Sequence, residues 1–218
     1  MEKKRIFPKL LIKWYRENGR NYPWRTSRDP YKILIAEIML QRTRADQVKP
    51  VYLEFISKYP NTRELNKAPE KDIREYFGRL GLLWRAKLVK SLAKELVNRF
   101  SGKIPQSRDL LLPLPAIGEY IADAVLCFGY GADVAVVDAN VCRIIKRVFG
   151  LVAKGEARRD RSFKRLAQEM VSSGKADEFN WAMIDFAALV CTPSSPKHSV
   201  CPMNEFCSYY QNLKLMEA

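Results

Sequence analysis

The segment Leu114–Gly118 is the feature that most constrains this chain. It contains a proline and a glycine, which favour turns, and it leads directly into the helical run Tyr120–Val125. A helix N-terminus carries unpaired backbone N–H groups and a partial positive charge, so such a turn can hold a phosphate. Asp138 follows eighteen residues after Tyr120. Taken alone, the turn predicts a connection between two helices, and Asp138 predicts a helix N-cap.

The charge of the chain favours a polyanionic partner. Among 218 residues, 38 Lys and Arg stand against 24 Asp and Glu, which gives a net charge of +14. That excess suits nucleic acid or an anionic membrane surface, and a generally basic protein is the plain alternative. No apolar run approaches the roughly 20 residues of a membrane-spanning helix. The N-terminal residues 1–5 lack the apolar stretch of a signal peptide, so we expect an intracellular location.

Apolar residues recur at helical intervals along most of the chain, and we predict an all-α fold. The apolar run Val134–Val137 could be a short strand, but no partner strands are evident, so we expect a buried connector. Pro8 is predicted to open the first helix. The predicted helices cover residues 9–17, 31–46, 48–58, 70–79, 84–100, 107–112, 120–130, 140–149, 161–172 and 179–190.

Three of the five cysteines lie close together near the C-terminus. Cys191, Cys201 and Cys207, with the single histidine His198, form the pattern C-x6-H-x2-C-x5-C. Closely spaced cysteines without an export signal indicate a metal or iron–sulfur site rather than disulfides. A zinc site is one alternative to an iron–sulfur cluster, but it fits this spacing less well because zinc ligands are usually paired as C-x2–4-C. The other two cysteines lie in apolar helical contexts and are expected to be core thiols.

Together these motifs resemble the DNA glycosylases of the endonuclease III superfamily. Ala116, Ile117 and Gly118 match the family's helix-hairpin-helix element, which grips the DNA backbone, although the family often has glycine where Ala116 stands. Asp138 matches the catalytic aspartate. The family commonly ends in C-x6-C-x2-C-x5-C around a [4Fe–4S] cluster, and this chain matches every spacing, with His198 in place of the second cysteine. The resemblance implies a cluster held by three cysteines and a histidine, or a cluster weakened by the replacement.

The resemblance runs from Tyr22–Arg25 to Cys207 and implies two helical domains. Residues 29–132 would form a helical barrel domain with the hairpin. Residues 1–28 and 133–218 would form a discontinuous second domain that carries the cluster region, 191–207. The family architecture implies a DNA-binding cleft between the domains. We expect a monomer in the cytoplasm or nucleoid that acts on double-stranded DNA and not on membranes.

Asp138, Glu37 and Tyr120 are the catalytic candidates that the resemblance implies. Cleavage of an N-glycosidic bond passes through an oxocarbenium-like sugar, which the Asp138 carboxylate would stabilise while it orients or deprotonates water. Asn140 would help to hold the Asp138 loop. Glu37 has apolar residues around it on its helix, and burial raises a carboxyl pKa, so Glu37 would bind or protonate the leaving base.

Tyr120 distinguishes the subfamilies. Endonuclease III has a lysine here, whose amine leads to strand cleavage through a Schiff base. Adenine-DNA glycosylases typically have a serine, and mismatch-specific thymine glycosylases have a tyrosine. Tyr120 therefore indicates a monofunctional glycosylase for thymine or uracil opposite guanine, with little lyase activity. The alternative is that Tyr120 is simply an aromatic residue of the first helical turn.

Base flipping leaves a gap in the duplex, which apolar wedge residues fill. Leu82 follows Gly81 in the loop that matches the family's wedge, and core packing is its alternative role. Gln41 and Arg42 lie where the family contacts the orphaned base, and a guanidinium can pair with guanine or a phosphate. Arg143 belongs to a basic helix face, with Lys146 and Arg147, that would contact phosphates or water.

Two other functions stay open at this point. An adenine-DNA glycosylase is supported by Glu37 within the run Glu37–Gln41, and opposed by Tyr120 and by the lack of a further C-terminal domain. A non-catalytic DNA-binding or redox-sensing iron–sulfur module is the second alternative. The joint presence of Glu37, Tyr120 and Asp138 argues against that module.

Overall fold

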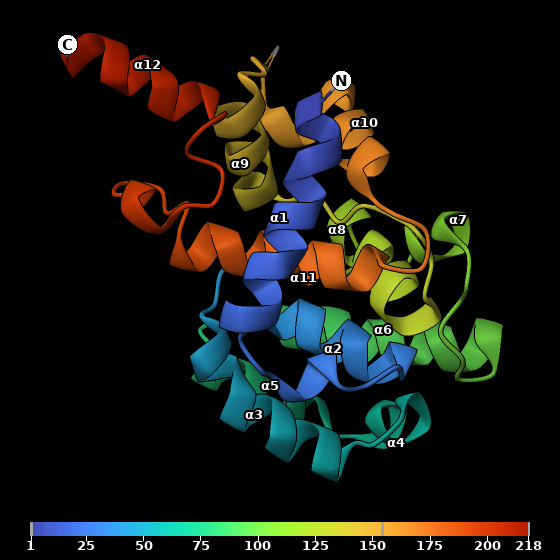
Figure 1. Cartoon of the computed structure of the whole chain (residues 1–218). Coiled ribbons are helices and arrows are strands. Elements are labelled where there is room, and N and C mark those ends of the chain that lie inside the picture. The colour runs from blue at the N-terminus through green and yellow to red at the C-terminus, as the bar shows by residue number, and fades with distance from the viewer. Residues whose placement is uncertain (1, 154, 218) are drawn as a thin grey trace. The chain divides into compact units, whose positions relative to one another are not determined.

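The structure, a computed structural model, describes residues 2–153 and 155–217. Within these ranges the chain forms helices and no strand, which confirms the all-α prediction (Figure 1). The chain separates into two compact units. The terminal unit comprises Met1–Arg20 and Ala132–Ala218, and the middle unit comprises Asn21–Gly131. None of the described helices is both long and apolar enough to cross a membrane.

The middle unit contains seven α-helices, a 3-10 helix before them and a π-helix after them. Their bounds are η1 Pro23–Arg25, α2 Pro30–Met39, α3 Ala45–Lys58, α4 Thr62–Lys67, α5 Glu70–Arg79, α6 Arg85–Phe100, α7 Arg108–Leu111, α8 Glu119–Ala124 and η2 Val125–Gly129.

The terminal unit combines the first helix with the last four long helices of the chain. Their bounds, with two short 3-10 helices, are α1 Glu2–Asn18, α9 Ala139–Phe149, η3 Ala157–Arg159, α10 Arg161–Met170, α11 Ala176–Leu189, η4 His198–Val200 and α12 Ser208–Glu217. Helix α1 packs against α11 and α10, and α9 packs against α11 and α12 (Figure 1).

The first helix begins earlier than its proline suggested. Helix α1 starts at Glu2, and Pro8 lies inside it. The turn before Pro8 is held by Phe7, whose fully buried ring meets Phe149 edge to face at 5.4 Å between centroids. Burial of a large aromatic side chain offsets the hydrogen bond that proline removes from the helix. The predicted start at residue 9 was therefore wrong.

Three further differences lie in the middle unit. The predicted helix 31–46 ends at Met39, and Arg42 in the following turn has a left-handed backbone with φ +63°. Helix α4 was not predicted, because six residues show little periodicity; its N-cap Asn61 accepts a hydrogen bond from the Glu64 N–H at 3.0 Å. The second half of the predicted helix 120–130 is the π-helix η2.

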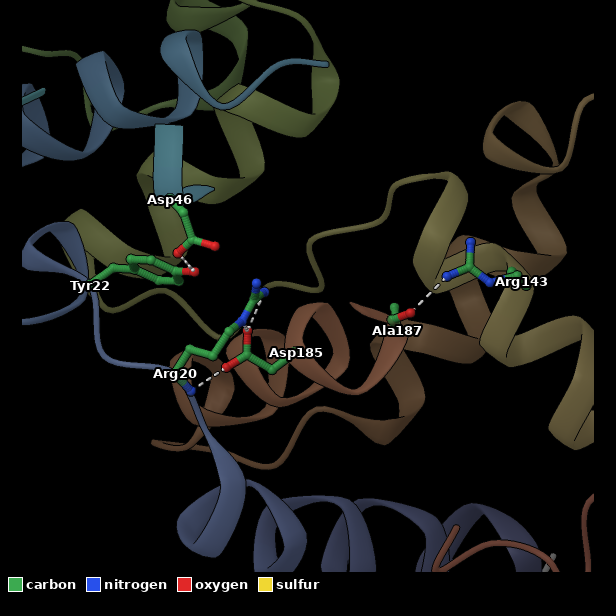
Figure 2. A network of polar contacts seen from close by, with 6 residues as sticks. All are labelled: Arg20, Tyr22, Asp46, Arg143, Asp185 and Ala187. Atoms are coloured by element: carbon green, nitrogen blue, oxygen red, sulfur yellow. Dashed lines mark hydrogen bonds and ion pairs between the residues drawn. The ribbon is translucent and has the colours of Figure 1, made fainter. Parts of the chain in front are cut away.

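Residues 21–28 lie with the middle unit, although the sequence analysis grouped them with the terminal segments. The rings of Tyr22 and Trp24 stack at 4.9 Å, and Trp24 meets Tyr52 of α3 edge to face. The Tyr22 hydroxyl donates a hydrogen bond to Asp46 at 3.0 Å (Figure 2). These aromatic contacts, which have no periodic signature, fix the segment to α3.

A buried ion pair closes the end of α1 in the terminal unit. Asp185 of α11 has no exposed surface and accepts hydrogen bonds from the Arg20 backbone N–H at 2.7 Å and from its guanidinium at 2.7 and 2.9 Å (Figure 2). A buried carboxylate needs such a partner, because removal of its water shell is costly. The pair therefore anchors the first segment of the chain on α11.

We predict that Arg20→Met lowers the free energy of unfolding by about 3 kcal/mol, because it leaves a charged carboxylate buried. Arg16→Met is the matched control: Arg16 of α1 pairs with Glu178 of α11 but is largely exposed. The control is expected to cost much less, because an exposed ion pair contributes little to stability. Urea unfolding followed by circular dichroism measures both, and equal losses would contradict the assignment.

Candidate functional site

The connector that carries Asp138 is held by side-chain amides. Residues 131–138 have no regular secondary structure, yet Ala135 and Val136 are buried. Asn180 of α11 accepts a hydrogen bond from the Val136 N–H at 2.9 Å and donates one to the Val134 carbonyl at 2.8 Å. Gln168 of α10 accepts from the Ala135 N–H at 2.9 Å and donates to the Asp133 carbonyl at 2.8 Å. Each side-chain amide thus supplies hydrogen bonds that a neighbouring β-strand would otherwise supply.

The connector was predicted, but neither amide was recognised as its partner. The available signal was Asn180 itself, because a polar residue within the apolar helical run Phe179–Phe186 needs a hydrogen-bond partner if it is buried. Asn180 is indeed buried. The paired amides thus set the backbone position from which α9 begins.

Asp138 begins α9 as its N-cap. Its carboxylate accepts a hydrogen bond from the Val141 N–H at 2.8 Å and another from the Asn140 side-chain amide at 2.7 Å. The side chain is half-buried. The Asn140 contact is the one expected from the sequence. Capping and chemistry are compatible roles, because a carboxylate has lone pairs beyond the two that these donors use.

Arg143 makes internal hydrogen bonds, and its contact with a DNA phosphate stays a prediction. Its guanidinium donates to the Asn140 side chain at 2.8 Å, the Ala187 carbonyl at 3.0 Å and the Cys191 carbonyl at 3.0 Å (Figure 2). Burial lowers the pKa of Arg143. These bonds satisfy carbonyls at the C-terminal end of α11 and just beyond it.

Arg147 continues the same pattern one turn further along α9. It donates to the carbonyls of Thr192 and Pro193 at 2.6 and 2.7 Å, and it lies 3.5 Å from the Cys191 sulfur. Arg147 also lies over the Tyr209 ring at 4.9 Å. The loop that begins at Cys191 is therefore tied to α9 by arginine donors.

The three C-terminal cysteines lie in a partly buried, largely apolar setting. The pKa of Cys201 is raised to about 11, mainly by burial and to a smaller extent by the charges of Cys207 and Cys191, so the thiols lie within electrostatic reach of one another. Burial also raises the pKa of Cys207. A cluster binds thiolates, so assembly would release protons from these thiols.

His198 stacks on the Tyr210 ring at 4.4 Å between centroids, and the Tyr209 ring lies 6.0 Å away. Among the described residues, no group of three or more His, Cys, Asp or Glu side chains converges on a single metal ion. The ligands of an iron–sulfur cluster bind different irons, so they stand further apart than the ligands of one zinc ion.

Glu37 and Tyr120 stand on two helices that pack together in the middle unit. Helix α2, which carries Glu37, packs against α8, which carries Tyr120 in its first turn. Glu37 is 4% exposed, in a helix whose other buried residues are apolar or aromatic. The expected burial of Glu37 is thus observed. Its chemical role stays a prediction.

The hairpin has the backbone of a tight turn. The Ile117 N–H bonds to the Leu114 carbonyl at 3.2 Å, and Ala116 has a left-handed φ of +65°. That conformation explains why a glycine suits the Ala116 position, since it avoids the clash of a Cβ atom. Gly118 is the N-cap of α8, and it is exposed while Ile117 is buried. The predicted hairpin residues therefore do form a turn at a helix start.

The three base-contact candidates differ in exposure. Arg42 is exposed and Gln41 is half-buried, so both side chains reach the surface of the middle unit. Leu82 is only 6% exposed, whereas Leu83 and Trp84 are 49% and 60% exposed. As a wedge, Leu82 would have to leave the core, because an inserting side chain must reach the duplex. Leu83 presents an apolar side chain without such a movement.

Two segments of the chain match family models. Residues 35–169 match the HhH-GPD superfamily base excision DNA repair protein, and residues 191–207 match the iron-sulfur binding domain of endonuclease III. The first match covers more than half of the chain. This chain therefore belongs to the HhH-GPD superfamily of base excision DNA repair proteins and carries that family's iron–sulfur segment.

Several individual DNA glycosylases are similar to this chain in sequence. The chain is 37% identical to the thymine/uracil-DNA glycosylase of Methanothermobacter thermautotrophicus, over 96% of each chain. It is 41% identical to that of Pyrobaculum aerophilum, over 94% of this chain and 92% of the relative. An adenine DNA glycosylase of Buchnera aphidicola is 33% identical, and the match spans 60% of that protein.

The solved structures agree with the sequence relatives. A thermostable thymine-DNA glycosylase superposes with a TM-score of 0.92 at 37% identity, over 97% of this chain and 98% of that chain. An endonuclease III trapped in a covalent complex with DNA superposes with a TM-score of 0.85 at 20% identity, over 98% of each chain, and shows a shared fold.

We predict that Asn180→Ala lowers the free energy of unfolding by roughly 2–4 kcal/mol, because it strands the Val136 N–H and the Val134 carbonyl in a buried position. Gln168→Ala is the control, since Gln168 is exposed and water can replace its amide. The control is expected to cost below about 1 kcal/mol. Thermal and urea unfolding measure both, and a near-neutral Asn180→Ala would show that the amide does not hold the connector.

Proposed function

We propose that this protein is a monofunctional DNA glycosylase that excises thymine or uracil mispaired with guanine. The observation that carries the proposal is Tyr120, at the position where lyase-active relatives have a lysine, in a chain 37–41% identical to thymine/uracil-DNA glycosylases over nearly its full length. The adenine DNA glycosylases match at lower identity, 33% for the Buchnera enzyme. The substrate is a G·T or G·U mismatch left by deamination of 5-methylcytosine or cytosine.

The chemistry breaks the N-glycosidic bond of a nucleotide flipped out of the duplex. The bond electrons leave with the base, and the sugar develops positive charge at C1′ as an oxocarbenium-like species. Asp138 stabilises that charge and accepts the proton of the water that adds to C1′. The Asn140 and Val141 donors support this role, because they fix the carboxylate on a rigid helix start.

Glu37 binds the leaving base and supplies its proton in this scheme, for which the buried position of its carboxyl is suited. Gln41 contacts the orphaned guanine, and Arg42 contacts the DNA beside it. The hairpin residues Ala116–Gly118 hold a DNA phosphate through backbone N–H groups. Leu83, rather than the buried Leu82, fills the gap in the duplex.

Tyr120 determines what happens after the base has left. A lysine at this position would attack C1′ and form a Schiff base, from which the strand breaks by elimination. A phenol cannot form a Schiff base. The product is therefore an intact strand with an abasic site.

The iron–sulfur group is a [4Fe–4S] cluster held by Cys191, Cys201, Cys207 and His198. When bound, it supplies a rigid crosslink between the residues of the C-terminal loop. Three observations support the fit: the cysteines lie within electrostatic reach of one another, Arg147 lies beside the Cys191 sulfur, and His198 is positioned by the Tyr210 ring. An imidazole ligand is known from Rieske-type centres.

Asp138→Asn provides the test of the catalytic proposal. Asparagine caps a helix as well as aspartate does, so the melting temperature is expected to stay the same. The single-turnover rate of base release from a G·U duplex is expected to fall by at least about 100-fold, since the carboxylate charge is lost. Asp133→Asn, on the same connector, is the activity control.

Retention of the wild-type rate by Asp138→Asn, with an unchanged melting temperature, would reduce Asp138 to an N-cap. A wild-type protein that binds mismatched duplexes without releasing any base would favour a non-catalytic DNA-binding module instead. Both results come from the same gel assay.

We also predict that His198→Cys keeps the cluster and lowers its reduction potential, because thiolate replaces a neutral imidazole as ligand. His198→Ala is expected to lose iron and sulfide. Iron content, visible absorbance and film voltammetry measure these changes independently of activity. A wild type that lacks iron while His198→Cys contains four irons per chain would show that histidine weakens the cluster.

A further inference from the structure

Arg85 is a buried cation without an acidic partner. It is the first residue of α6 and is only 7% exposed. Across the described residues it forms no ion pair, and its Nε atom has no hydrogen-bond partner. Its guanidinium carbon lies 4.3 Å from the centroid of the Trp84 ring. A charged group buried in this way is normally paired, so its isolation requires an explanation.

The groups around Arg85 are also positively charged. The N-terminus of a 16-residue helix is a centre of partial positive charge, and the first turn of α6 contains no acidic residue. Trp84, the N-cap, makes no side-chain capping bond. The Arg42 charge lies close enough to lower the pKa of Arg85, although burial is the larger cause. Arg85 therefore stands at a helix N-terminus where the described residues form no ion pair with it, and the Arg42 charge acts on it as well.

The chain presents these groups next to exposed apolar residues. Leu83 and Trp84 are among the most exposed large apolar residues of the middle unit. Arg42 is exposed, forms no ion pair among the described residues, and has a left-handed backbone with φ +63°, which is strained for a non-glycine residue. Strain of this kind persists where the surrounding structure requires one side-chain position.

We propose that Arg85, Arg42 and the N-terminus of α6 bind one phosphate of the DNA backbone, beside the point where Leu83 and Trp84 meet the bases. This inference rests on the proposed function, because it takes duplex DNA as the ligand. A phosphodiester carries the full negative charge that can offset two guanidinium groups and a helix N-terminus. A guanine edge offers only partial charges, so the phosphate is the better complement.

Arg85→Met tests the site. Methionine keeps an unbranched side chain in the core, so the melting temperature without DNA is expected to stay the same or rise. The dissociation constant for duplex DNA is expected to increase about tenfold, and the slope of log K against log salt to fall by about 1. Both changes should be equal for a fully paired duplex and for a G·T duplex whose thymidine carries a 2′-fluorine to prevent excision.

Arg42→Met provides a second variant, because an exposed residue can be replaced without harm to the core. Its effect on affinity should be similar and should not add fully to that of Arg85→Met, since both residues bind the same phosphate. Arg99→Met, which removes a charge from the opposite end of α6, is the control and should leave affinity and salt slope unchanged.

Unchanged affinity and salt slope in both variants, with a wild type that still excises thymine, would overturn this inference alone. A loss confined to the duplex with guanine opposite the fluorinated thymidine would overturn it in favour of base recognition. A wild type that neither binds nor excises would overturn the proposed function together with the phosphate site.

Discussion

The hydrogen bonds between two side-chain amides and an extended connector determine where Asp138 stands. The connector has no strand beside it, so the Val136 N–H and the Val134 carbonyl would lack partners without the buried Asn180, while the exposed Gln168 bonds the Ala135 N–H and the Asp133 carbonyl. Because the four bonds fix the chain immediately before α9, they also fix the start of that helix. Helices α10 and α11, which carry the two amides, therefore hold the carboxylate of the N-cap residue Asp138 in a fixed position. A loop without these anchors would leave the carboxylate free to move, and an imprecise carboxylate is a poor catalyst.

In the terminal unit, the basic residues on one face of α9 make bonds within the fold. Arg143 and Arg147 lie on one face of α9, but their guanidinium groups satisfy carbonyls at the end of α11 and at the start of the cysteine-rich loop. The residues around Asp138 and those around Cys191 therefore form one hydrogen-bonded structure. Arg85 has the opposite character, since it is buried without acceptors. A charged side chain without a partner in the fold is a better indicator of a ligand site than one that bonds to backbone carbonyls.

Periodicity and motifs predicted the all-α class, most of the long helices and the residues that define the family. They did not predict the start of α1, because Phe7 burial overrides the local effect of Pro8. They also missed α4, which is too short for periodicity, and the break after Met39, which depends on one residue in a left-handed conformation. Neither the burial of Leu82 nor the internal bonds of Arg143 could be predicted, since both depend on contacts between distant segments. The type of each residue can be taken directly from the sequence, whereas its exposure depends on how distant segments pack in the fold.

The central claim is that the chain releases a pyrimidine opposite guanine and leaves the strand intact. The most direct measurement incubates excess protein with end-labelled duplexes that contain G·T, G·U or 8-oxoguanine·A, and resolves the products with and without hot alkali. The account predicts breaks in the G·T and G·U strands only after alkali, and none in the 8-oxoguanine·A duplex. Release of adenine would place the enzyme with the adenine glycosylases, and breaks without alkali would contradict the role of Tyr120.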